Sequence, residues 1–164
     1  MAGAEASHQF LSLVGPIDVK DLRRQAVVEL AFAEIKRSAP GVHHYGLPQA
    51  CGRFCNASQH NFGGPLEQRF RDLGLKVEAP IRAAVKLDAG CTLWSEQGET
   101  GVMIPVFERP VEVLLEAHGE TEEERLLSAI VWDNTQALHL LNKGLRIING
   151  NIRFIYLIYA AAKK

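Results

Sequence analysis

The stretch TEEERLLSAIVWDNTQALHLLN, residues 121–142, carries the strongest local signals in this chain. Thr121 and Glu124 have the spacing of a capping box, and the acidic start of the stretch favours the positive end of a helix dipole. Apolar residues recur along it at helical spacing, and Lys143-Gly144 follows as a stop signal. The stretch therefore predicts one long helix over Thr121–Asn142.

Alternating apolar runs lie on both sides of this predicted helix. Such runs are typical of half-buried strands. We expect strands at residues 81–87, 91–94, 101–107, 111–117, 145–148 and 152–159. The last two runs are separated by Asn149-Gly150, which is a strong signal for a hairpin turn.

Two further helical segments precede the strands. Asp18 can cap a helix that runs to about Ser38, and a short helix is expected over Pro65–Leu73. Residues 40–64 between them are rich in glycine and proline and predict a loop. The element order predicts an α+β fold, with a mostly antiparallel sheet of about five strands packed against one long helix, plus an N-terminal helix.

The length of 164 residues fits a single domain, 1–164. Within it we expect an N-terminal helical extension with a Cys/His loop, 1–63, and an α+β core, 64–164. The 18 basic and 19 acidic side chains give a formal net charge of −1, which provides no general attraction for nucleic acid. No segment resembles a signal peptide or a membrane span, and the odd count of three cysteines favours a reducing compartment. We expect a cytoplasmic protein that binds neither nucleic acid nor membrane.

The segment 43–60 gathers His43, His44, Cys51, Cys55 and His60. Thiolate and imidazole ligands suit zinc, and Cys55 with His60 or His43 as its base is an alternative nucleophile pair. The spacing of the two cysteines differs from that of the usual zinc pairs, and nothing in the segment identifies a group that would activate a thiol. We therefore expect no metal, no cofactor and no catalytic residue here.

Residues 101–107 are apolar on both faces of the predicted strand. One face consists of Met103, Pro105 and Phe107, and the other of Val102, Ile104 and Val106. One face must pack against a helix, whereas the other is either covered by the N-terminal helix or open to a partner. We expect a partner-binding surface at Met103, Pro105 and Phe107.

Trp132 falls outside the core stripe of the predicted long helix, near Ser128, Gln136 and His139. It is either partly covered by the N-terminal helix or an anchor at an interface, where aromatic side chains are common. We expect these four residues to form the interface of a homodimer.

Residues Lys86–Trp94, KLDAGCTLW, resemble the first hairpin of class I type III secretion chaperones, the Tir-chaperone-like family. Asp88-Ala89-Gly90 is similar to the Asp-x-Gly turn of that hairpin, and Leu73-Gly74-Leu75 to the end of the preceding helix. The resemblance continues through the following strands and the long helix and covers roughly residues 64–160. It implies a homodimer built through the long helix, with apolar grooves that hold an extended segment of a partner.

These observations favour a chaperone or adaptor that captures an extended apolar segment of another protein, such as a secreted effector. Capture on exposed sheet surface or at a sheet edge would use backbone hydrogen bonds for affinity and side-chain pockets for selectivity. Two alternatives are an enzyme with a Cys/His site in the 43–60 segment and a structural component of a larger assembly. We expect that the protein is not an enzyme.

Overall fold

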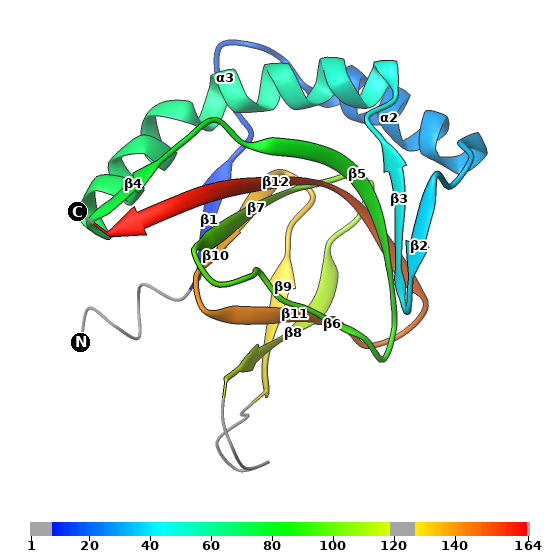
Figure 1. Cartoon of the computed structure of the whole chain (residues 1–164). Helices are drawn as coiled ribbons and strands as arrows, with labels where there is room; N and C mark the ends of the chain where they lie inside the picture. Colours follow the sequence, from blue (N-terminus) through cyan, green and yellow to red (C-terminus); the bar gives the residue numbers. More distant parts are fainter. Residues whose placement is uncertain (1–7, 119–126, 164) are drawn as a thin grey trace.

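The computed structural model describes residues 8–118 and 127–163, and these residues form mostly sheet (Figure 1). Two helices are present in them, α2 (Lys20–Phe32) and α3 (Gln49–Asp72). The strands are β1 (His8–Ser12), β2 (Arg37–Ala39), β3 (Val42–Gly46), β4 (Leu75–Val77), β5 (Ile81–Asp88), β6 (Thr92–Leu93), β7 (Glu99–Pro105), β8 (Val111–Ala117), β9 (Leu127–Trp132), β10 (Gln136–Leu140), β11 (Lys143–Ile147) and β12 (Asn151–Lys163). Neither helix carries a stretch long and apolar enough to cross a membrane.

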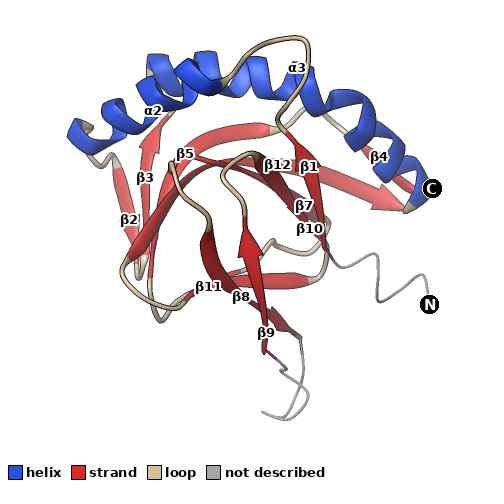
Figure 2. Cartoon of the chain, turned by 180° about the vertical axis from the view of Figure 1, so that it is seen from behind, coloured by secondary structure: helices blue, strands red, loops and turns tan. Residues whose placement is uncertain are grey.

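The strands form two antiparallel sheets. The large sheet has eight strands in the order β1-β10-β7-β12-β5-β3-β2, with β4 added along β12. The small sheet has four strands in the order β6-β11-β8-β9. Figures 1 and 2 show the helices over one face of the curved large sheet and the small sheet against its other face. The protein is therefore built in three layers.

A separate apolar core fills each of the two spaces between these layers. Leu30, Phe54, Phe62 and Ile104 belong to the core between the helices and the large sheet. Trp132, Met103, Phe154 and Leu145 belong to the core between the two sheets. The large sheet is thus covered on both faces, which explains why its central strands are apolar on both sides.

The predicted α+β fold with about five strands against one long helix is wrong. Residues 127–142, expected to be helical, contain β9 and β10, which pair in different sheets. A turn at residues 133–135 separates them, because the Asp133 carboxylate accepts hydrogen bonds from the Thr135 backbone N–H (2.8 Å) and hydroxyl (2.6 Å). Such turns compete with helix formation. The predicted capping box, Thr121 and Glu124, lies outside the described residues.

The prediction of a loop over residues 40–64 is also wrong, because most of these residues belong to α3. Buried residues recur at helical spacing along α3, among them Cys51, Phe54, Ser58 and Phe62. Burial of this stripe outweighs the weak helix propensity of Gly52, Gly63, Gly64 and Pro65, all of which lie inside the helix. The expected helix at 65–73 corresponds to the last turns of α3, so the boundary placed at residues 63 and 64 falls within one helix.

A carboxylate from α2 caps the start of α3. The two oxygens of Glu29 accept hydrogen bonds from the backbone N–H groups of Ala50 (3.0 Å) and Cys51 (2.9 Å). These N–H groups have no partner within a helix, and a negative charge at this end is favourable. Glu29 thereby fixes the two helices to one another.

The helix that follows Asp18 is shorter than predicted. Asp18 accepts a hydrogen bond from the Lys20 N–H (3.0 Å) at its start, but α2 ends at Phe32 instead of Ser38. After a short connection at residues 33–36 the chain forms β2, which pairs with β3 across a two-residue turn, Pro40-Gly41. Gly41 adopts a φ of 76°, which glycine accommodates without strain.

The turn at Asn149-Gly150 has a different role from the hairpin that its sequence predicts. Gly150 does adopt a positive φ of 67°. However, β11 pairs with β6 and β8, whereas β12 pairs with β4, β5 and β7. The turn therefore carries the chain from the small sheet to the large one.

The other strands expected at 81–87, 101–107 and 111–117 correspond to β5, β7 and β8.

Candidate functional site

A pocket of about 420 Å³ opens where β1 leads into α2. Its wall consists mainly of the loop between these elements and the first turns of α2, and Thr135 also contributes to it. Most of the exposed lining is apolar, and the charged groups lie on α2 and just before it. The lining residues are Leu13, Val14, Gly15, Ile17, Asp18, Val19, Lys20, Arg23 and Thr135.

Asn61 of α3 holds the loop that forms this wall. Its side-chain amide nitrogen donates to the backbone oxygens of Leu13 (2.8 Å) and Ile17 (2.6 Å), and its side-chain oxygen accepts from the Ile17 N–H (3.1 Å). The Leu13 N–H in turn donates to the Thr135 backbone oxygen (2.9 Å). The loop is thereby held between α3 and the β9–β10 turn, which makes the pocket largely pre-formed.

Gly15 is required by the close approach of this loop to α3. A Cβ atom at residue 15 would lie 2.6 to 2.8 Å from three side-chain atoms of Asn61. Real Cβ atoms essentially never come so close to another heavy atom. Glycine therefore permits the Asn61 contacts that shape the pocket.

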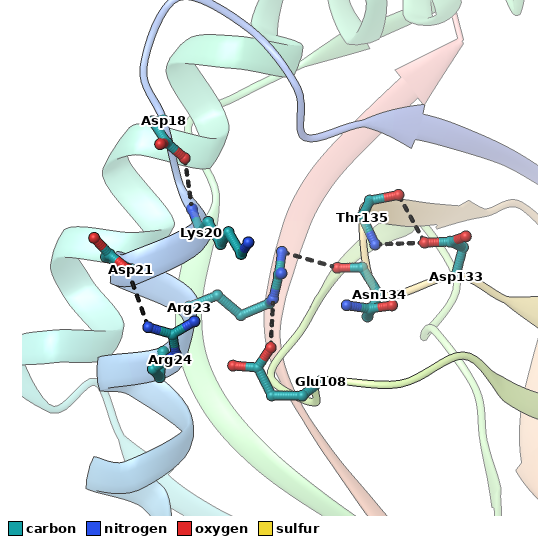
Figure 3. A network of polar contacts seen from close by, with 9 residues as sticks. All are labelled: Asp18, Lys20, Asp21, Arg23, Arg24, Glu108, Asp133, Asn134 and Thr135. Carbon is teal, nitrogen blue, oxygen red and sulfur yellow. Dashed lines mark hydrogen bonds and ion pairs between the residues drawn. The ribbon is translucent and has the colours of Figure 1, made fainter.

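Arg23 is the central polar group of the site (Figure 3). Its side chain is only 8% exposed. Nε donates to the Glu108 carboxylate at 3.4 Å and Nη1 donates to the Asn134 backbone oxygen at 3.3 Å. Both distances are long for hydrogen bonds from a charged donor. Within residues 8–118 and 127–163, Nη2 makes no hydrogen bond, and it is not among the fully buried atoms that lack a partner. This nitrogen is therefore accessible to a further acceptor.

Lys20 adds a second cation. Figure 3 shows its side chain extending from the start of α2 toward the Arg23 guanidinium. Asp18 accepts a backbone hydrogen bond, and Asp133 accepts two from Thr135, which lower the pKa of the Asp133 carboxyl. Both carboxylates keep their negative charge, and Glu108 pairs with Arg23, so the lining of the pocket holds two cations, Lys20 and Arg23, and one carboxylate, Asp18. Such an arrangement can hold an anionic group next to an apolar body.

The residues predicted to bind a partner lie inside the protein. Met103 is 1% exposed and belongs to the core between the sheets, and Pro105 is buried as well. Phe107 is partly buried, and its ring packs edge-on against Trp132. The neighbouring side chains Val102 and Ile104 belong to the core under the helices. Both faces of β7 are therefore covered by the chain itself, and a partner-binding role for these three residues stays a prediction.

The four residues predicted at a dimer interface do not share one surface. Trp132 is fully buried, and its indole N–H donates to the Gln136 backbone oxygen at 2.8 Å. His139 is also fully buried, whereas Ser128 is exposed on β9. The homodimer stays a prediction, and the helix on which it was based is replaced by strands.

His139 belongs to a buried chain of hydrogen bonds between α3 and the large sheet. Arg69 Nε–H donates to His139 Nδ1, so the second ring nitrogen must carry the proton. That Nε2–H donates to the Thr100 hydroxyl oxygen (2.7 Å), and the hydroxyl donates to the Leu140 backbone oxygen (2.9 Å). Burial, and then the charge of Arg69, lower the pKa of His139 to about 3. The imidazole is therefore neutral and acts as a structural link.

The histidines and cysteines of residues 43–60 do not converge. Cys51 and Cys55 are fully buried on α3, where burial raises the pKa of both thiols and makes them poor nucleophiles. His60 is exposed on α3, whereas His43 and His44 lie on β3. In the described part of the chain, no group of three or more His, Cys, Asp and Glu side chains could hold a metal ion. Cys91 lies beside Gly41, at the β2–β3 turn.

His43 has partners that lie outside the predicted Cys/His set. Its Nδ1 lies 2.9 Å from the Ser38 hydroxyl oxygen, and its Nε2 lies 2.8 Å from a carboxylate oxygen of Asp88. These residues come from β2, β3 and the end of β5. Ser38 and Asp88 were not predicted as site residues, because only strand pairing brings them to His43.

Comparison with protein-family models and with curated protein sequences found no match for this chain. The site therefore has to be interpreted from its own geometry. One signal in the sequence could have located Arg23. It occupies the same helical stripe as the buried residues Val19, Ala26 and Leu30. A cation at a core position needs a specific partner or a ligand, because burying its charge without one is costly.

Proposed function

We propose that the protein binds a small molecule that has one anionic group and an apolar body, and that straight-chain monocarboxylates represent this class. The observation that carries the proposal is the buried Arg23 guanidinium, whose Nη2 has no partner in the described residues, at an apolar pocket of about 420 Å³. This volume lies within the range of roughly 300–1,000 Å³ that is typical of small-molecule pockets.

The chemistry of the pocket favours a carboxylate as the anionic group. A guanidinium presents N–H donors in a planar fork that matches two carboxylate oxygens. Lys20 supplies a second positive charge in the lining of the pocket, which also contains the carboxylate of Asp18. The apolar part of the ligand would contact Leu13, Val14 and Ile17. The Val14 side chain is 76% exposed and would become buried by the ligand. Burial of apolar surface of this kind contributes about 25 cal/mol per Å².

Replacement of Arg23 by glutamine is expected to weaken octanoate binding roughly tenfold or more. The reason is that hydrogen bonds to charged groups contribute about 1.5–3 kcal/mol each. Titration calorimetry with octanoate measures this loss, and octanol serves as the uncharged ligand of the same length. The wild-type protein should bind octanoate more tightly than octanol, and Arg23→Gln should remove the difference.

The matched control is Arg24→Gln, because Arg24 is the next residue on α2 and pairs with Asp21 on the exposed side. This control should bind octanoate like the wild type. A second variant, Ile17→Trp, adds bulk at the rim of the pocket and should weaken octanoate and octanol alike. The proposal is abandoned if the wild type binds none of the monocarboxylates from hexanoate to decanoate, or if both arginine variants bind equally well.

A second candidate function is the one predicted from the sequence, capture of an apolar segment of a partner protein. One observation favours it at a different surface. Phe32 is 86% exposed at the end of α2, and Val28, one turn earlier on the same side, is also exposed. Neighbouring exposed apolar side chains of this kind often mark a binding surface.

If α2 binds a partner through these side chains, Phe32→Ser should abolish the binding of an extended, apolar, fluorescently labelled peptide, as measured by anisotropy. Ile81→Ser is the control, because Ile81 is another exposed apolar residue, on β5. Equal peptide binding by both variants would rule out this surface.

A further inference from the structure

Ser38, His43 and Asp88 form a continuous hydrogen-bonded series on the large sheet. Ser38 and His43 are directly opposite one another in the β2–β3 pair. His43 is also opposite Lys86 on β5, and Asp88 lies two residues further on the same face. The position of Asp88 is fixed by its N–H, which donates to the Gly41 backbone oxygen at 2.9 Å. Three paired strands therefore hold these side chains in place.

The two hydrogen bonds determine which tautomer the His43 imidazole adopts. An ionised carboxylate can only accept, so the bond to Asp88 places a proton on His43 Nε2. In the neutral ring, Nδ1 then carries a lone pair and accepts the Ser38 hydroxyl proton. This is the arrangement in which a base activates a serine and a carboxylate orients the base. The two ring nitrogens are exchanged relative to the serine protease triad, which leaves the proton transfers unchanged.

The series is accessible at its serine end. Ser38 is exposed, whereas the His43 side chain is 21% exposed. Among the described strands, β2 pairs only with β3 and thus forms an edge of the large sheet. The Lys36 N–H donates to the His44 backbone oxygen (2.7 Å), and Pro40 has no N–H. The donors left to this edge are therefore N–H groups of β2 that point away from β3. Such an N–H can donate to a carbonyl oxygen that is brought next to Ser38, as one donor of an oxyanion hole.

We propose that Ser38 is an acyl-accepting nucleophile for small activated esters, with His43 as its base and Asp88 as the positioning residue. Ser38 Oγ attacks the ester carbonyl carbon while its proton moves to His43 Nδ1. The bond to the leaving oxygen breaks, and the imidazolium returns the proton to that oxygen. Water then attacks the acyl-serine, His43 takes the water proton and passes it to Ser38 Oγ, and a carboxylic acid is released.

The probe for this activity is p-nitrophenyl acetate. The wild-type protein should release nitrophenolate and gain one acetyl group, which peptide mass spectrometry should locate on Ser38. Ser38→Ala should lose this adduct, and His43→Gln should form it roughly a hundredfold more slowly, as expected for loss of a general base. The control is Ser128→Ala, because Ser128 is another exposed strand serine, on β9, and has no histidine or carboxylate partner among the described residues.

Asp88→Ala tests the positioning role. Nuclear magnetic resonance of the histidine ring nitrogens should show the Nε2–H form of His43 in the wild type and a mixture in the variant, with slower acetylation and an unchanged circular dichroism spectrum. Acetylation confined to lysine side chains, at the same rate in the wild type and in Ser38→Ala, would show that Ser38 is an ordinary surface serine. Retention of the Ser38 adduct at the wild-type rate in His43→Gln would equally overturn the proposal.

Discussion

Trp132→Ala is expected to lower the free energy of unfolding by about 3–5 kcal/mol, because it removes the largest fully buried side chain in the core between the sheets. The indole ring packs edge-on against Phe107, with 5.2 Å between ring centroids, and lies 5.9 Å from Phe154. Its loss also leaves the Gln136 backbone oxygen without the hydrogen bond from the indole N–H. Urea-induced unfolding measured by far-ultraviolet circular dichroism gives the change.

Val131→Ala is the matched control for this prediction. Val131 is the neighbouring residue on β9 but is 59% exposed, so its truncation should change the free energy of unfolding by less than about 0.5 kcal/mol. The outcome also distinguishes a core position from an interface. If Trp132→Ala unfolds at the wild-type urea concentration and only lowers the molecular mass in light scattering, Trp132 anchors a dimer and the burial argument fails.

Acidification from pH 6.5 to pH 3 is expected to destabilise the protein by up to about 5 kcal/mol through His139 alone. The pKa of His139 is about 3 in the folded protein, whereas an unfolded histidine titrates near pH 6.5. Between these values the unfolded chain binds the additional proton, so stability present above pH 6.5 is lost as the pH falls. Burial also lowers the pKa of His8 and of His44, which act in the same direction.

The contribution of His139 is isolated by His139→Gln. Glutamine does not titrate and can still hydrogen bond, so the free energy of unfolding of this variant should depend less steeply on pH between 6.5 and 3. Its stability at neutral pH should be lower, because the contacts to Arg69 and Thr100 are altered. His60→Gln is the control, since His60 is exposed on α3. Equal pH dependence in the wild type and His139→Gln would mean that His139 accepts a proton without cost.

The strands could be predicted from the sequence better than the helices. Alternation along 111–117 is a local pattern, and β8 occupies the same residues. Residues 127–142 were wrongly predicted as a helix for two reasons. A strand that is covered on both faces lacks the alternation of apolar and polar residues, and the apolar residues here recur at helical spacing. β10 is such a strand, since Ala137 and Leu138 belong to different cores. In α3, Gly63 and Gly64 favour the prediction of a loop. The helix forms nevertheless, because its stripe of buried residues packs against the rest of the protein.

The candidate sites were harder to predict because they depend on contacts between residues that are distant in sequence. Asn61 meets the Ile17 backbone across 44 residues, and His43 meets Asp88 across 45. No local pattern specifies such pairs without the strand order. Arg23 is different, because its place on the buried stripe of α2 was visible in the sequence. The Cys/His site, which was only an alternative to the predicted absence of a site, does not come together, because helix α3 directs its cysteines into the core.

The central position of β12 has a consequence for how the chain folds during synthesis. β12 joins two groups of three strands, β1-β10-β7 and β5-β3-β2, that make no other connection within the large sheet. Until residues 151–163 leave the ribosome, β5 and β7 each have an unpaired apolar edge, and neither helix has a complete sheet to cover. Sheets that depend on such non-local pairing fold slowly and expose aggregation-prone edges meanwhile. The nascent protein should therefore depend on protection until β12 is made.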